Sequence, residues 1–251
     1  QNEATGFARS MHDTGLVSAY HTVLVRHLLN EGEHLLSEAL GLSSTGRDCL
    51  MCYRELALSL IDACVFPATP QAIYGLSLML ERGILYQPPV APAMWRQLGL
   101  PLSTYARDRL AMAFGDQATP EAFLLEGVLC MLGLPLGVGQ GNNPTCQSAR
   151  ALSMWAYNDP DYMLQMVTWA ARDNEIIMHF EGDPHRWVNP EFHGWWSGRG
   201  FRLNVDVPTG KLVDLDNFLR HFYAAYHPFH NGNQPLIHPQ PAGIAVTDSA
   251  A

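Results

Sequence analysis

The chain has 251 residues, of which 47% are hydrophobic and 16% charged. This composition excludes a disordered or collagen-like protein and suits one large domain or two small ones. The net charge of −9 argues against a nucleic-acid partner, because a surface that follows phosphates needs an excess of basic residues. No apolar stretch approaches the roughly 18 residues of a membrane span, so we expect no membrane-spanning segment.

The first 135 residues have the apolar spacing of helices. Residues 15–42 and 47–66 repeat apolar side chains every three or four positions. Two helix starts are predicted where Thr69-Pro70 and Thr119-Pro120 place a threonine at the N-cap and a proline at the first helical position. Each of these helices should end at a glycine. The proline-rich stretch 87–95 is predicted to be a connector between helices.

The pattern changes after Pro135. A glycine-rich loop, residues 137–143, precedes an apolar helical stretch, and a second helix is expected over 161–172. Three short segments rich in aromatic and branched residues follow, at 175–180, 192–196 and 201–207, and predict consecutive antiparallel strands. A last helix is expected over about 215–226. We therefore predict an α+β fold with a helical subdomain (1–135), a catalytic core of helix and small sheet (136–238) and a tail (239–251).

Cys146 is the candidate nucleophile. Asn143 is a good N-cap and Pro144 a good first helical residue, which puts Cys146 in the first turn of a helix. Free N–H groups and the positive end of the helix dipole stabilise a thiolate there. The alternative is a structural cysteine at a helix start, although a loop rich in glycine and asparagine is not typical of a hydrophobic core.

A thiolate nucleophile needs a base and a group that orients the base. His193 and Asp206 lie on successive predicted strands that a turn at 197–200 would bring side by side. Gln140 could place its amide beside the Cys146 backbone N–H as an oxyanion hole. Trp195, Trp196 and Asn142 are the expected substrate-binding residues, with the tryptophans lining an acyl groove.

These residues resemble a known superfamily. Gln140-Gly141 followed by Cys146 at a helix start resembles the papain-like pattern, and His193-Gly194-Trp195-Trp196 with Asp206-Val207-Pro208 resembles the transglutaminase-like one. The resemblance covers about 137–216 and implies a papain/transglutaminase-like core, a helix bearing the cysteine packed on a small antiparallel sheet, with a Cys-His-Asp triad. The aromatic residue that follows the cysteine in papain-like enzymes is missing here, where Gln147 stands.

Other residues compete for the same roles. His179, on the first predicted strand, is the alternative base, and Asp214 or Asp216 could replace Asp206, although both are typical of a helix N-terminus. Cys49-x-x-Cys52 and His227-x-x-His230 have no further ligands at zinc spacing, so we expect no metal and no cofactor. Cys64 and Cys130 lie among apolar residues and are predicted to be small core side chains.

The predicted activity is cysteine-dependent acyl transfer on a protein carboxamide through a thioester, either glutamine deamidation or transglutamination. A papain-like cysteine protease is the alternative, and a non-catalytic protein-binding module, with the helical part as its binding surface, is the second. Five cysteines, an odd number, favour a reducing, cytoplasmic environment. Lys211 is the only lysine, which reflects either genomic base composition or selection against ubiquitin acceptors in a bacterial effector or toxin delivered into a host cell. Because the chain begins at Gln1, we expect a processed chain or an excised piece that has lost any targeting segment.

Overall fold

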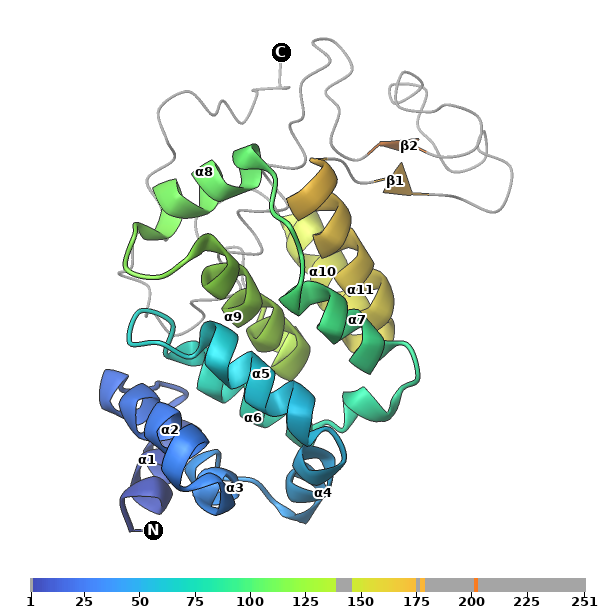
Figure 1. Cartoon of the computed structure of the whole chain (residues 1–251). Coiled ribbons are helices and arrows are strands. Elements are labelled where there is room, and N and C mark those ends of the chain that lie inside the picture. The colour runs from blue at the N-terminus through green and yellow to red at the C-terminus, as the bar shows by residue number, and fades with distance from the viewer. Residues whose placement is uncertain (1, 139–145, 175–176, 179–200, 203–251) are drawn as a thin grey trace.

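The computed structural model describes residues 2–138, 146–174, 177–178 and 201–202. Helices dominate this part of the chain (Figure 1). The 3-10 turns are η1 (Glu33–Leu35), η2 (Ile84–Tyr86) and η3 (Pro135–Gly137), and a π-helical turn spans Trp169–Asp173. The α-helices are α1 (Asn2–Thr14), α2 (Ala19–Glu31), α3 (Leu36–Ala39), α4 (Ser44–Cys52), α5 (Arg54–Cys64), α6 (Gln71–Glu81), α7 (Val90–Leu98), α8 (Thr104–Phe114), α9 (Pro120–Gly133), α10 (Cys146–Asn158) and α11 (Pro160–Thr168).

The predicted α+β fold with a papain/transglutaminase-like core is wrong for the part of the chain that the structure describes. Strand residues there amount to β1 (Ile177–Met178) and β2 (Phe201–Arg202), paired antiparallel with Ile177 opposite Arg202. Two strands of two residues present too little apolar surface to form a sheet on which a helix could pack. The branched and aromatic residues at 175–180 and 201–207 favour strands. A sheet also requires neighbouring strands, which local composition does not specify.

The α6–α9 pair forms the centre of the helical body (Figure 1). Nearly every residue of α9 is buried, as expected for a helix that is apolar on all sides. A Cβ added to Gly75 of α6 would lie 2.6 Å from the backbone N of Cys130 and from the backbone C of Leu129. A Cβ on Gly133 would lie 2.5 Å from the carbonyl oxygen of Gly75. The two helices therefore touch backbone to backbone, which only glycine allows.

The predicted ends of α9 are confirmed, whereas the predicted start of α6 is wrong, because the helix begins at Gln71 and Pro70 is its N-cap residue. The Thr119 hydroxyl accepts a hydrogen bond from the Ala122 N–H, Pro120 is the first helical residue and the helix ends at Gly133. Thr69 does not cap α6 with its side chain. Its hydroxyl donates to the Cys64 carbonyl (2.6 Å) and accepts from the Phe66 N–H, so it caps the end of α5 instead. A buried hydroxyl between two helix termini can serve either one, and the bend of the chain at 65–69 decides which.

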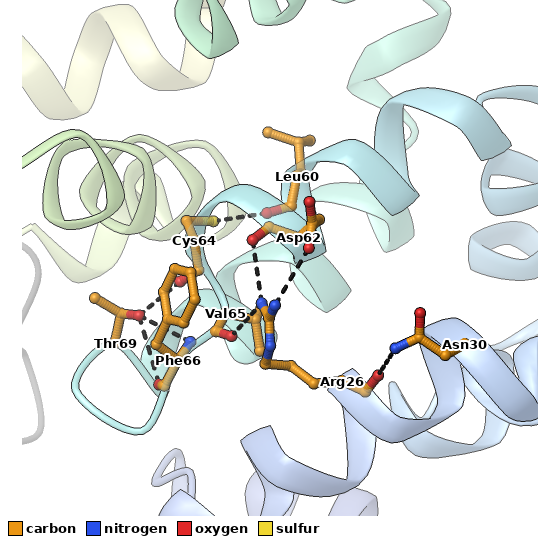
Figure 2. Close-up of polar contacts among 8 residues, drawn as sticks. All are labelled: Arg26, Asn30, Leu60, Asp62, Cys64, Val65, Phe66 and Thr69. Atoms are coloured by element: carbon orange, nitrogen blue, oxygen red, sulfur yellow. Dashed lines mark hydrogen bonds and ion pairs between the residues drawn. The ribbon is translucent and has the colours of Figure 1, made fainter. Parts of the chain in front are cut away.

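Arg26 of α2 completes the same cap (Figure 2). Its guanidinium donates to the carbonyls of Asp62 (3.1 Å) and Val65 (3.2 Å) and pairs with the Asp62 carboxylate (3.2 Å). The guanidinium also lies over the Phe66 ring, 4.6 Å from its centroid. A cation at a helix C-terminus satisfies carbonyls that have no partner within the helix. This polar cluster therefore fastens α2 to α5.

The proline-rich stretch 87–95 is not the predicted connector, because most of it belongs to α7. Pro89 is the N-cap residue, and the Ala93 N–H makes its hydrogen bond to the Pro89 carbonyl. Pro92 lies in the first turn, where its missing N–H would have no acceptor within the helix. Proline is therefore tolerated here, and the apolar side chains of Val90, Ala93 and Met94 supply the buried face.

The helical body continues past residue 135. α10 packs against η3 and α9, and α11 packs against α7. The side-chain amide of Gln97 in α7 donates to the Leu164 carbonyl (3.1 Å) and to the Thr168 hydroxyl (2.9 Å), which fixes α11 just before the π-helical turn. The domain boundary expected at 135 stays a prediction. Among the described residues, no helix has the length and apolar character needed to span a bilayer.

Candidate functional site

Cys146 is the first residue of α10. The predicted helix start at Asn143 and Pro144 lies outside the described residues, so the position of this cysteine in the first turn stays a prediction. The first N–H groups of any α-helix have no carbonyl partner within the helix, and they carry the positive end of its dipole. A helix N-terminus is in general a position that favours a thiolate. The predicted position would therefore meet the first requirement of a cysteine nucleophile.

The C-terminal half of α10 is packed against its neighbours through aromatic rings. Trp155 lies edge-on to Tyr162 of α11 with ring centroids 5.5 Å apart, and Tyr162 lies edge-on to Trp169 at 6.3 Å. Leu152 and Ala156 are buried on the inner face of α10. Rings packed edge to face add to the stability that their burial provides. α10 is consequently fixed over its second half, away from Cys146.

Arg82 holds the end of α10 to the end of α9. Its guanidinium donates to the Leu132 carbonyl of α9 and to the Ala156 carbonyl of α10 (3.5 Å), and it lies over the Tyr157 ring at 5.6 Å. Partial burial lowers the pKa of Arg82 from its usual value, but the group stays charged at neutral pH. The Arg82 guanidinium thus interacts favourably with the negative ends of two helix dipoles, those of α9 and α10. Cys146 lies about 15 Å along α10 from this contact, at 1.5 Å per residue.

Three of the four other cysteines are poor nucleophiles. Burial raises the pKa of the Cys49 thiol to about 11 and raises the pKa of Cys64 and Cys130 well above the ordinary value. The Cys64 thiol donates to the Leu60 carbonyl (3.1 Å), and the Cys130 thiol lies 3.5 Å from the Gln71 carbonyl oxygen. Thiols of this kind stay protonated at neutral pH and react slowly. The prediction that Cys64 and Cys130 are packed among core residues is confirmed.

Cys52 differs because it is exposed and ends α4. Its hydrogen bond with Tyr86 raises the pKa of that phenol to about 12. A helix C-terminus presents carbonyl oxygens and the negative end of the dipole, which disfavour a thiolate. The Cys49-x-x-Cys52 pair thus lies at the wrong end of a helix for redox chemistry. No cluster of three or more metal-ligating side chains occurs in the part of the chain that the structure describes.

The residues predicted to assist Cys146 lie outside the described residues. This applies to the base His193, the orienting Asp206, the oxyanion residue Gln140 and the substrate-binding residues Asn142, Trp195 and Trp196, as well as the alternatives His179, Asp214 and Asp216. The triad therefore stays a prediction from sequence.

Glu126 is a candidate that sequence reasoning missed. It is 1% exposed in the apolar helix α9, and its charge raises the pKa of both the Cys64 and the Cys130 thiol. Burying a carboxyl group in an apolar interior lowers the stability of the fold, so a buried carboxyl group is a candidate functional residue. The signal was present in the sequence, since Glu126 is the only charged residue between Ala122 and Gly133.

The described part of the chain is mainly helical, with one short strand pair. No family model, no curated protein and no solved structure matches this chain.

Proposed function

We propose that this protein catalyses acyl transfer from a protein carboxamide through a thioester on Cys146. The observation that carries the proposal is the position of Cys146 as the first residue of α10. Support also comes from the other cysteines. Cys49, Cys64 and Cys130 have pKa values raised by burial, and Cys52 ends its helix. Within the described residues, Cys146 has the helix position that best stabilises a thiolate.

In the proposed reaction, His193 takes the proton from the Cys146 thiol and the thiolate sulfur attacks the carbonyl carbon of the carboxamide. The tetrahedral oxyanion is stabilised by the Cys146 N–H and the Gln140 side chain. The C–N bond then breaks, His193 returns its proton to the leaving nitrogen, and a thioester remains. Water or an amine attacks the thioester and releases the thiol. Asp206 keeps His193 in the required tautomer.

A glutamine side chain is the favoured substrate, with a peptide bond as the alternative. The favoured choice depends on the spacing of His193 and Asp206 in the sequence. The three outcomes differ in product mass. Deamidation replaces the amide –NH2 by –OH, transglutamination joins the added amine with loss of ammonia, and proteolysis splits the chain. The mass of a glutamine-bearing test protein incubated with and without a primary amine distinguishes them.

The first test is the pH dependence of iodoacetamide labelling at each cysteine of the full chain, read by mass spectrometry. Cys52 is the internal reference, since it is exposed and lies at the opposite end of a helix. We expect Cys146 to react about tenfold faster than Cys52 near neutral pH. His193→Ala should slow the labelling of Cys146, whereas His27→Ala, which removes an exposed histidine of α2, should not. Equal rates for Cys146 and Cys52 would refute the proposal.

A protein-binding role is the competing proposal, and one observation favours it. Tyr20 and Val23 of α2 are 78% and 58% exposed, and their spacing of three residues places them on one face of the helix; Leu16, 49% exposed, precedes the helix. Exposed apolar side chains that cluster are typical of protein contact surfaces. If binding is the function, Cys146→Ala will act as wild type in a cellular assay while Tyr20→Ser loses the effect. Met51→Ser, equally exposed on α4, is the control.

A further inference from the structure

Two histidines from different helices meet the end of the short helix α3. The Nε2 of His21, in α2, lies 2.8 Å from the Ala39 carbonyl oxygen, and the Nε2 of His12, in α1, lies 3.2 Å from that of Leu40. Ser77 of α6 donates to the Leu40 carbonyl as well (2.8 Å). We name His12, His21 and Ser77 the histidine clasp. It satisfies carbonyls that a four-residue helix leaves without partners.

Neighbouring residues leave room for the imidazole rings of His12 and His21 and pack against them. The His21 ring stacks on Phe7 of α1 with centroids 5.3 Å apart. Gly41 follows α3 with φ +66°, and a Cβ at this position would lie 2.7 Å from Cδ2 and Nε2 of His12. A side chain larger than hydrogen at residue 41 would thus displace the ring of His12 and strain the backbone. Glycine here lets His12 reach the end of α3.

The hydrogen bonds define the protonation state of His21. A carbonyl oxygen only accepts, so Nε2 must carry the proton, and in the neutral ring Nδ1 then carries a lone pair. His21 is 1% exposed, and its Nδ1 is buried with no hydrogen-bond partner. Protonation would add both a charge and an unsatisfied N–H to this apolar position. The folded clasp therefore requires a neutral His21.

The charged groups around His21 do not compensate for its protonation. From α1, His12 acts on His21 and lowers its pKa by repulsion. From α3, the Glu38 carboxylate accepts a hydrogen bond from the Ser37 hydroxyl (2.8 Å) rather than from an imidazole. From α5, Asp62 pairs with Arg26, and α6 contributes Ser77 and Tyr74, the latter against His12. Burial is the largest influence on the pKa of His21 and lowers it below 6.5, against a smaller opposite effect of the Ala39 carbonyl.

We propose that the histidine clasp is a pH-sensitive latch, which opens in mild acid and frees α1 and the start of α2 from α3 and α6. Above pH 6.5 the ring is neutral in both the closed and the open state, and the latch has its full stability. Below 6.5 the open state binds a proton that the closed state excludes, so closure weakens as pH falls.

The test is hydrogen exchange of the full chain between pH 7.5 and 5, at roughly half-unit steps that bracket the ordinary histidine range, read by mass spectrometry and corrected for the intrinsic pH dependence of exchange. We expect the opening constant of α1 peptides to rise by about tenfold per pH unit below the ordinary histidine value. Peptides from α9, at the centre of the body, should show no such rise. Parallel loss of protection in α1 and α9, or none in α1, would overturn the proposal.

Substitutions test the assignment to His21. His21→Gln keeps an N–H donor for the Ala39 carbonyl but cannot titrate, so α1 should lose its pH dependence. His27→Gln removes an exposed histidine of the same helix and should behave as wild type. If His21→Gln fails to fold, NMR titration of the wild-type His21 ring replaces it, with protonation expected only as α1 opens. A His21 ring that titrates in closed α1 at its ordinary value, or a His21→Gln variant with unchanged pH dependence, contradicts the latch.

Discussion

The α6–α9 pair and the α1–α3 end of the molecule are both helical, but different interactions hold them. The α6–α9 pair is apolar, and its backbones touch at Gly75, Gly133 and Cys130. At the α1–α3 end, polar side chains of His12, His21 and Arg26 reach helix carbonyls. Close packing tolerates almost no change in shape, whereas hydrogen bonds to ionisable groups respond to pH. The comparison suggests a rigid centre and an end whose attachment can be adjusted.

The largest effect is expected for Gly75→Ala. The added Cβ meets backbone atoms of α9, which cannot move aside without separating the two helices. We expect a loss of about 3 kcal/mol in the free energy of unfolding, measured by urea denaturation. Gly6→Ala is the matched control, because a Cβ on Gly6 meets nothing within 4 Å in α1. It should be neutral or stabilising by up to about 1 kcal/mol. Similar destabilisation by both would refute the backbone contact.

An intermediate and local effect is expected for Gly41→Ala. Its φ of +66° disfavours any side chain, and the new Cβ displaces His12 from the Leu40 carbonyl. We expect a cost of about 1–2 kcal/mol, with faster hydrogen exchange in α1 than in α9. Gly83→Ala, at φ +61° in the left-handed region with only ordinary van der Waals contacts around the Cβ, isolates the backbone cost alone. If exchange of α1 is unchanged in Gly41→Ala, His12 does not hold α1.

The smallest effect is expected for Asp62→Asn. The carboxylate of Asp62 is 69% exposed, and Arg26 keeps its two carbonyl contacts and its place over Phe66 when the charge is removed. An exposed ion pair contributes about 0.5 kcal/mol. Arg26→Ala should cost more, because it removes the guanidinium that donates to the Asp62 and Val65 carbonyls at the end of α5. Equal losses in urea denaturation would mean that the ion pair, rather than the cap, fastens α2 to α5.

Local signals in the sequence were sufficient where one residue acts on its own helix. Thr119 and Pro120 start α9 as predicted, and Gly133 ends it. Of the segments predicted as strands, the structure describes only 177–178 and 201–202, which do pair, but these four residues do not make the sheet of the predicted α+β core, because a sheet depends on further partner strands that local composition does not specify. The partners proposed for Cys146 likewise depend on contacts between distant segments, and they stay predictions.

Capping and apolar spacing act within a few residues, so the ends of several helices follow from the sequence. The sequence also predicts that Cys146 lies at a helix start. Three other features depend on packing: Thr69 caps α5 rather than α6, Gly75 touches the backbone of α9, and His12 and His21 meet at the end of α3. Each of these contacts joins residues on separate elements, so it exists only after the helices have packed.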